Sequence, residues 1–334
     1  MISIVEEPLY FEDLKKKHRT SPNYFIRDRI LTFPLLTLYL ANFIKGSSQD
    51  ELDQLFKAIH KLDVPERMVT PSALCQARKK LSHEVFIDLQ DAVCDFVNGN
   101  APLVTYHGMR VFAIYGSTMI LPDTSENREH FGTASNKGSK RAMARISTFH
   151  DILNRITIDG LIRPYTVGET TMTWDHLEDA RLPAGSLIVM DRGYTDFRIL
   201  KTLFLDGHQF CVRVRSDLRI YKEFLRSGRD EMILDYQPSV DLGRIEGPNS
   251  RLSKGFRVRM VRFPVEGQEC VLMTSLLDSK TFPIHEIGDL YHQRWEVEES
   301  YKVKKCRMKL EALSGSTPAI IRQDFHAKVF AECL

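Results

Sequence analysis

The sequence predicts an α/β domain that follows a small helical unit and is interrupted by a strand-rich segment. A short apolar run, Leu187–Met190, ends at Asp191 and is followed by a helical segment, Asp196–Leu205. Residues 25–97 have helical spacing, whereas residues 209–277 are rich in strand-forming, alternating sequence. Strands that end in acidic residues and lead into helices are typical of α/β domains whose active groups lie at strand ends.

The sequence predicts the starts of two helices within the first hundred residues. Ser48–Glu51 has capping-box spacing, and apolar residues then recur at helical intervals, at Leu52, Leu55, Phe56 and Ile59. Thr70 followed by Pro71 is a second start and leads into a basic helix over residues 72–80. This helix either reads DNA as in a helix-turn-helix or packs on the next helix, expected over residues 84–97.

Strands are predicted from about residue 104 onward. Short apolar runs indicate strands over 110–115, 118–121, 145–149 and 152–158, ahead of the run that ends at Asp191. Later, alternation places Arg213 with Arg215 on one face of a strand, and Arg257 with Arg259 on one face of another. Such arginines either face water or contact DNA. A last helix begins at Thr317–Pro318, again a cap followed by proline.

Composition excludes several classes of protein. With 334 residues, 43% of them hydrophobic and 27% charged, the chain can bury a large core over two or three domains. Its net charge of +2 excludes a general polycation, and six cysteines without CxxC pairing argue against zinc and for a reducing cytoplasm. We expect no secretory signal, and the apolar stretch over residues 31–44 is too short for a membrane span.

Basic residues are nevertheless clustered. Runs of this kind suit a phosphate track, although many are simply solvated faces. The three clusters are Lys137, Lys140, Arg141 and Arg145; Arg251, Lys254, Arg257, Arg259 and Arg262; and Lys302, Lys304, Lys305, Arg307 and Lys309.

A helical run near the C-terminal end carries four polar side chains on one face. At about 100° per residue, Tyr291, Arg294, Glu298 and Lys305 fall within roughly 60° of arc. A carboxylate flanked by cations can hold a metal ion while the cations grip a phosphodiester. An isolated helix with ordinary surface ion pairs is the alternative.

Together with two further segments, this helix makes the chain resemble the DDE transposases of bacterial insertion sequences, of the insertion-sequence-4 type. The Tyr-Arg-Glu-Lys spacing of that family is matched without a gap, and Asp191 lies in the Asp-Arg-Gly-Tyr turn of the second family Asp. The first family Asp is expected within Ala113–Ser117, where Tyr115 stands instead. The resemblance covers about residues 25–330.

The resemblance implies a ribonuclease-H-like catalytic domain with a β-rich insertion, preceded by a small helical domain. The implied division is a lead over 1–24, a candidate DNA-binding helical domain over 25–100, and the first part of the catalytic domain over 101–208. It continues with the β-rich insertion over 209–285 and a C-terminal part over 286–334, which carries the Glu helix and is expected to be truncated.

It also implies an activity and its residues. Relatives cut and join DNA strands by two-metal phosphoryl transfer, so Asp191 and Glu298 are expected to be catalytic ligands of Mg²⁺, with Mn²⁺ as an alternative. Tyr291, Arg294 and Lys305 would hold the phosphate backbone. DNA contact is likewise favoured for the strand residues Arg213, Arg215, Arg257 and Arg259. The implied partners are double-stranded DNA, at element ends and target, and a second copy in a synaptic homodimer. No membrane is involved, and the implied location is the bacterial cytoplasm, at the nucleoid.

Tyr115 bears on whether this member of the family can be catalytically active. A phenol is neutral at pH 7 and is a poor substitute for a bridging carboxylate. Asp123 lies in a Leu-Pro-Asp-Thr turn that is interpreted as structural. This copy is therefore predicted to be catalytically impaired. The alternative function is a non-catalytic DNA-binding remnant that represses transposition. An unrelated ribonuclease-H-like nuclease would leave the Arg and Lys of the helix unexplained.

Overall fold

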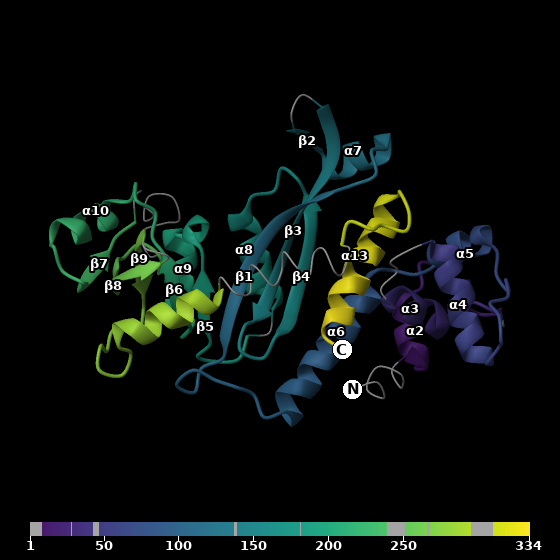
Figure 1. The fold of residues 1–334 in the computed structure, drawn as a ribbon, viewed down its shortest axis with the longest axis horizontal. Helices are drawn as coiled ribbons and strands as arrows, with labels where there is room; N and C mark the ends of the chain where they lie inside the picture. Colours follow the sequence, from purple (N-terminus) through teal and green to yellow (C-terminus); the bar gives the residue numbers. More distant parts are fainter. Residues whose placement is uncertain are drawn as a thin grey trace.

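The computed structural model describes residues 9–27, 29–42, 47–136, 139–180, 182–238, 251–265, 268–294 and 310–334. Its centre is one large mixed sheet with strand order β2-β3-β1-β5-β6-β9-β8-β7, and β4 pairs with β3. Helices cover parts of both faces, and a separate group of helices lies at one end of the sheet (Figure 1). The predicted mixed α/β class is confirmed.

The sheet combines a parallel centre with antiparallel flanks. β1 and β5 are parallel, as are β5 and β6, whereas β3 runs antiparallel to both β1 and β4. β2 also pairs antiparallel with β3, and the pairings beyond β6 are antiparallel. The strands are β1 (Val111–Ile120), β2 (Thr133–Asn136), β3 (Ser139–Asp151), β4 (Ile156–Pro164), β5 (Leu187–Met190), β6 (Gln209–Arg213), β7 (Glu231–Tyr236), β8 (Phe256–Val265) and β9 (Gln268–Thr274).

The predicted strand boundaries were wrong in three places. Val111–Ile120 form one continuous strand rather than two, because Gly116 and Ser117 pair with β3 like their neighbours. The strand expected over 145–149 is longer, since β3 runs from Ser139 to Asp151. The strand expected over 152–158 begins only at Ile156, since residues 152–155 turn and Arg155 adopts the left-handed conformation at φ 57°. A tight reversal thus joins β3 to β4.

Helices on the two faces of the sheet are held by alternate residues of the central strands. Phe112, Ile188 and Phe210 belong to the core beneath α8 (Glu169–Asp179) and α9 (Phe197–Leu205). Their neighbours point the opposite way and meet the helix described over residues 284–294. This alternation follows from the two-residue repeat of a strand. The smaller helices are α7 (Ser125–Phe131), the one-turn η1 (Arg192–Tyr194) and α10 (Arg219–Arg226).

The N-terminal helices share a core with the last helix of the chain. They are α2 (Glu12–His18), α3 (Phe33–Ala41), α4 (Ser48–His60), α5 (Pro71–Arg78) and α6 (Glu84–Asn100). The last helix, α13 (Pro318–Glu332), lies between them and the sheet (Figure 1). Both threonine-proline caps are confirmed: Thr70 accepts from the amide of Ala73 at 3.2 Å, and Thr317 from that of Ile320 at 3.5 Å. The capping box predicted from Ser48 was wrong, because α4 already begins at Ser48 and its N-cap is Ser47, whose side chain makes no capping hydrogen bond.

The position of α13 joins two parts of the chain that the sequence appeared to separate. Ala327 and Phe330 pack with the N-terminal helices, whereas Phe325 and Val329 pack with the sheet. The approach to the sheet is close, because a Cβ atom at Gly160 of β4 would lie 2.9 Å from the Val329 side chain. Among the described helices, none is long and apolar enough to cross a membrane.

Candidate functional site

Three parallel strands bring polar side chains to one edge of the sheet. Ala113 pairs with Val189, and Met190 pairs with Val212. Continuing these registers places Tyr115 of β1 level with Asp191 at the end of β5, and Asp191 level with Arg213 of β6. By strand alternation, all three point to the face that the 284–294 helix covers.

The Asp191 carboxylate is held by its own turn and is met by the covering helix. Its Oδ1 accepts from the amide of Arg192 at 2.7 Å, which caps η1, and the Tyr291 hydroxyl donates to Oδ1 at 3.5 Å. Burial raises the pKa of Tyr291 above its usual value, and the Asp191 charge adds to this while Arg294 opposes it. Tyr291 therefore remains a hydrogen-bond donor at physiological pH.

Two guanidinium groups accompany that carboxylate. Arg294 is 7% exposed, and its guanidinium carbon lies 5.2 Å from the centre of the Tyr291 ring. Burial raises the pKa of the nearby Cys270 thiol. The charges of Arg213 and Arg294 lower this pKa, whereas the charge of Asp191 raises it. Strand pairing places Arg213 of β6 opposite Leu272 of β9, two residues from Cys270. The structure brings four predicted site residues together: Asp191, Arg213, Tyr291 and Arg294.

Tyr115 occupies the remaining position at this edge. It is half-buried and packs against the apolar cluster beneath α13. Within the described part of the chain, no three His, Cys, Asp or Glu side chains gather in a way that could hold a metal ion. Glu298 and Lys305 lie outside the described residues. The described groups can bind an oxyanion beside a single carboxylate.

A second carboxylate lies beneath the Asp191 turn and was not predicted. Glu169, in the first turn of α8, accepts from Arg145 Nη1 at 3.2 Å. Gly116 makes room for it, since a Cβ atom there would lie 3.3 Å from Glu169 and 3.2 Å from the Tyr194 hydroxyl. Burial raises the pKa of Tyr194, and the charges of Glu169 and Asp191 add to the effect. The only hint in the sequence was the glycine beside Tyr115.

A buried Ser-His-Asp arrangement anchors α8 to the sheet. His176 Nδ1 lies 2.6 Å from Asp159 Oδ2, and its Nε2 lies 2.8 Å from Ser147 Oγ. Ser147 is 2% exposed and His176 is fully buried, so a substrate carbonyl has no access to the hydroxyl. The arrangement is structural and positions the helix that carries Glu169.

The other predicted strand arginines do not join the site. Arg215 is exposed and binds Asp217 through two hydrogen bonds, of 3.0 and 2.6 Å. Arg257 is exposed on β8, opposite Asp235 of β7.

Arg259 does not lie on the exposed face from which the predicted DNA contact would be made. The side chain is 1% exposed, forms an ion pair with Glu231 and donates to the carbonyl of Phe282 at 2.6 Å. Alternation did place Arg259 on the face of Arg257, but the segment that leads into the 284–294 helix covers that face at Arg259.

Comparisons with known proteins agree with this geometry. A family profile described as "Transposase DDE domain" matches residues 106–334. Transposase InsG for insertion sequence element IS4, from Escherichia coli K12, is 23% identical over 299 residues, which cover 86% of this chain and 66% of InsG. Putative transposase InsZ from the same organism is 30% identical over 106 residues, which cover 30% of this chain and 34% of InsZ. The chain thus spans just under two thirds of InsG and about a third of InsZ.

A solved structure shares the fold. The piggyBac transposase in a synaptic complex with hairpin DNA superposes with a TM-score of 0.51 at 11% identity, over 99% of this chain and 73% of that one. The family profile spans β1, β5 and the helix of Tyr291, which supply the site. The chain belongs to the DDE transposases, and within them to the IS4 type.

Proposed function

We propose that this chain binds the DNA ends of its insertion element through their phosphate backbone, and that the site around Asp191 is the strand-cutting and joining site of its relatives. The observation that carries the proposal is the meeting of Asp191, Arg213, Tyr291 and Arg294 at one edge of three parallel strands. Reaction at a phosphodiester needs cationic donors on the phosphate oxygens and a carboxylate that holds a metal ion or orients the nucleophile.

The proposed fold of this region is ribonuclease-H-like. The order β4-β3-β1-β5-β6, with β3 antiparallel and β1, β5 and β6 parallel, supports it. Residues 101–208 would form its first part, residues 209–285 the β-rich insertion and residues 286–334 the part that carries the Glu helix. The insertion would lengthen the sheet beyond β6.

Each side chain has a proposed task. Arg213 and Arg294 would bind phosphate oxygens, for which a planar guanidinium offers paired donors. Tyr291 would donate from its protonated hydroxyl and keep the Asp191 carboxylate in place. Lys305, on the same helix face by spacing, would add a further cation.

DDE transposases generally use divalent metal ions, and the residues of this chain fit one ion better than two. Asp191 and Glu298 would hold Mg²⁺, or Mn²⁺, which is bound by one or two carboxylates while it keeps several waters. A pair of ions needs a further carboxylate at Tyr115, where the phenol is uncharged. A bound ion would polarise the phosphoryl oxygens. We infer that this copy is impaired in catalysis but still binds the phosphate backbone.

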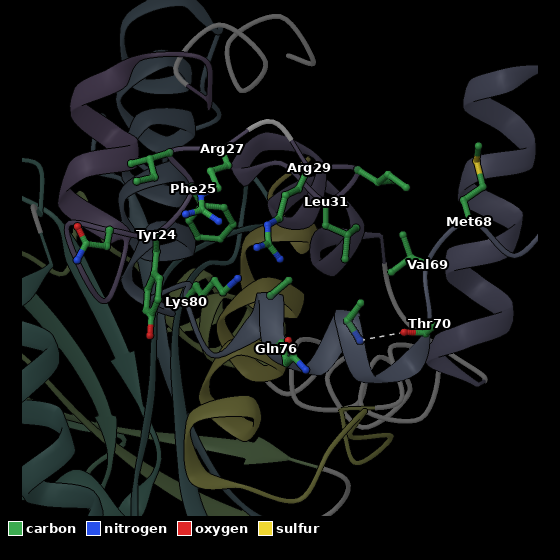
Figure 2. Close-up of a pocket in the computed structure, with 15 residues that line it drawn as sticks. Tyr24, Phe25, Arg27, Arg29, Leu31, Met68, Val69, Thr70, Gln76 and Lys80 are labelled. Carbon is green, nitrogen blue, oxygen red and sulfur yellow. Dashed lines mark hydrogen bonds between the residues drawn. The ribbon is translucent and has the colours of Figure 1, made fainter.

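The helical part over residues 25–100 is proposed to take part in DNA binding. A hollow of about 930 Å³ lies against α5, and Figure 2 shows Arg29 and Lys80 pointing toward the same space. Arg27 and Tyr24 also line it, and no acidic residue does among those that the structure describes. A cationic hollow with an aromatic side chain suits a nucleic acid.

The alternative function is a non-catalytic DNA-binding protein that represses transposition by occupying element ends. The composition of the site favours this alternative. Arg213 and Arg294 could still bind phosphate, whereas Tyr115 replaces the first aspartate that catalysis requires. In either case we propose a homodimer, because two element ends must be held together.

One experiment tests the proposal. Gel-shift with element-end DNA, with and without Mg²⁺, should show binding in both conditions, whereas cleavage of the same DNA should be absent. The Arg213→Gln/Arg294→Gln variant should bind more weakly, with a log-log salt slope about 2 units shallower, at about 0.9 per phosphate contact. Equal binding by this variant and the wild type would remove the phosphate role.

A further inference from the structure

The turn that follows Asp191 opens onto a hollow in the surface. This hollow has a volume of about 340 Å³ and is lined by Arg192, Gly193, Arg215, Ser216 and Asp217. Arg192 and Arg215 are exposed, and they come from the ends of neighbouring strands. Two guanidinium groups therefore border the space next to the proposed reacting centre.

The hollow continues into a second one along α10. The second has a volume of about 500 Å³ and shares Asp217 with the first. Its other lining residues are Arg219, Lys222, Glu223 and Arg226. Because Asp217 lines both, the two hollows are neighbours on the surface between the Asp191 turn and α10.

α10 presents its cations as a fixed stripe. Ile220 and Phe224 are buried in the core beneath α9, which fixes the orientation of the helix. Arg219, Lys222 and Arg226 are exposed, and their spacing of three and four residues places them on one side of the helix. A rigid helix therefore points these cations into the second hollow.

The charge of this surface is strongly one-sided. Five cations line it against two carboxylates, and Asp217 is already held by the two hydrogen bonds from Arg215. Among the described residues, no carboxylate lies within ion-pair distance of Arg219, Lys222 or Arg226. Ion pairing among the described residues of this surface is therefore confined to Arg215 and Asp217, at the end nearest Asp191.

We propose that this surface, the basic track (Arg192, Arg215, Arg219, Lys222 and Arg226), binds the phosphate backbone of the DNA arm that leaves the Asp191 site on one side of the scissile phosphate. The inference rests on the proposed function. The stripe from Arg219 to Arg226 extends about 10 Å at 1.5 Å per residue. Since phosphates of one strand are spaced about 3.4 Å along the helix axis, it can follow about three of them.

The test uses the full chain and three DNAs that contain the element end: one with both flanking arms, and two that each lack one arm. The Arg219→Gln/Lys222→Gln variant should bind two-armed DNA with a salt slope about 2 units shallower than that of the wild type. The same deficit should appear with one of the one-armed DNAs and vanish with the other. Glu223→Gln, which removes an acid from the stripe, should tighten binding with the same dependence on that arm.

The matched control is Lys16→Gln/Lys280→Gln, which removes two exposed cations from other parts of the chain. A deficit equal to that of the control, or one equal across all three DNAs, would overturn the proposal in favour of a general charge effect. A change in self-association without dependence on the arm would overturn it in favour of a protein partner. Failure of the proposed function gives a different result from failure of the basic track. If the Asp191 site does not bind phosphate, the Arg213→Gln/Arg294→Gln variant should bind all three DNAs as tightly as the wild type does.

Discussion

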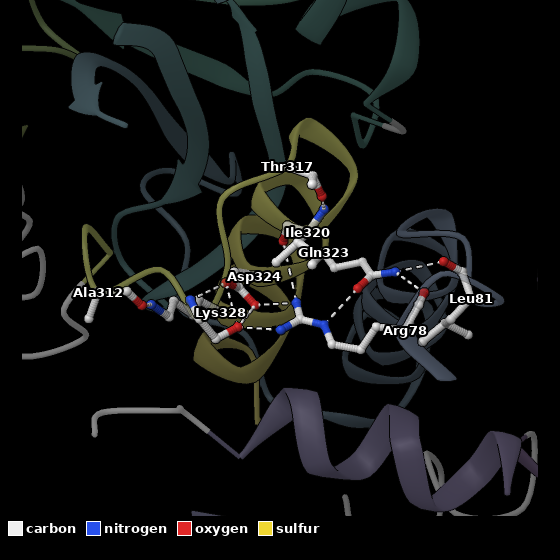
Figure 3. Close-up of polar contacts among 9 residues, drawn as sticks. Arg78, Leu81, Ala312, Thr317, Ile320, Gln323, Asp324 and Lys328 are labelled. Carbon is white, nitrogen blue, oxygen red and sulfur yellow. Dashed lines mark hydrogen bonds and ion pairs between the residues drawn. The ribbon is translucent and has the colours of Figure 1, made fainter. Parts of the chain in front are cut away.

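Arg78 and Asp324, which are 246 positions apart in the sequence, form a buried ion pair at 2.6 Å. Figure 3 shows the network around them, in which Gln323 accepts from Arg78 Nε at 3.0 Å and donates to the carbonyls of Arg78 and Leu81 at 2.8 and 2.7 Å. The Ser314 amide donates to Asp324 at 2.7 Å. This network fastens α5 to α13.

Removal of one partner of this pair should destabilise the whole chain. Arg78→Met leaves the Asp324 carboxylate buried, at 4% exposure, without its guanidinium partner. We expect a loss of about 3–5 kcal/mol in the free energy of unfolding, measured by urea denaturation. The double variant Arg78→Met/Asp324→Leu should recover only part of that loss, because the Asp324 charge is gone but the buried Lys328 loses the same carboxylate. A loss below about 1 kcal/mol in the single variant would show that water solvates Asp324.

The sequence predicted local structure well where local chemistry decides it. The starts of α5 and α13 were predicted because a capping threonine followed by proline acts within one turn. Spacing placed Tyr291 and Arg294 on one helix face, whereas their grouping with Asp191 was implied by the resemblance to the DDE transposases.

What the sequence could not predict depends on contacts between distant segments. The sequence indicates that Arg78 lies on a basic surface helix, yet its side chain is buried in an ion pair with Asp324. Arg259 alternates like an exposed strand residue, yet the Phe282 segment covers it. The predicted boundary near residue 100 divides a core that α13 completes, because α13 lies more than 200 residues further along the chain. The α10 stripe was also missed, since its arginines are few and are interrupted by apolar residues.

The two arginines of β8 should behave differently when they are replaced. Arg259→Met removes a buried ion pair and the bond to the Phe282 carbonyl, so we expect a lower free energy of unfolding and an unchanged salt slope for DNA binding. Arg257→Gln should leave stability within about 0.5 kcal/mol. If Arg257 contacts a phosphate, its variant should lower the salt slope by about 0.9. The opposite pattern would mean that Arg259 becomes exposed when DNA binds.

Stability should fall in mild acid because two histidines are held neutral next to cations. The rings of His83 and His326 are 5.0 Å apart, and burial lowers the pKa of His326 well below its ordinary 6.5, with the charges of Arg322 and Arg163 adding to the effect. Below about pH 6.5 the unfolded chain therefore binds a proton that the folded chain does not, so the free energy of unfolding decreases as pH falls.

Urea unfolding at about pH 7.5 and about pH 5.5 measures this decrease, and the comparison of variants isolates its source. His326→Gln has no group to protonate, so its decrease should be smaller than that of the wild type, whatever its stability at neutral pH. His285→Gln is the control and should leave the decrease unchanged, because His285 is exposed and is not among the groups that act on His326. Parallel decreases in all three proteins would assign the acid sensitivity to other groups.

Position 115 should decide whether the site can cut DNA. Tyr115 is level with Asp191 on the parallel neighbouring strand and faces the same side of the sheet, so Tyr115→Asp would place two carboxylates at adjacent strand ends. Two carboxylates there, with Glu298, complete the oxygen ligands that a pair of Mg²⁺ ions requires. We expect the unmodified chain to show no strand cleavage and Tyr115→Asp to nick element-end DNA when Mg²⁺ is present.

Metal binding gives a readout of this prediction that does not depend on cleavage. Calorimetric titration with Mn²⁺ should show one weak site in the wild type and tighter or additional binding in Tyr115→Asp, because an added carboxylate raises affinity for a hard cation. Tyr115→Asn, which has a similar shape without the charge, is the matched control and should behave like the wild type. Adding Asp191→Asn to the Tyr115→Asp variant should abolish both the nicking and the gain in metal affinity. Cleavage by the wild type would mean that another acid, such as Glu169, supplies the ligand, and nicking that persists in a chelator would exclude the metal-dependent mechanism.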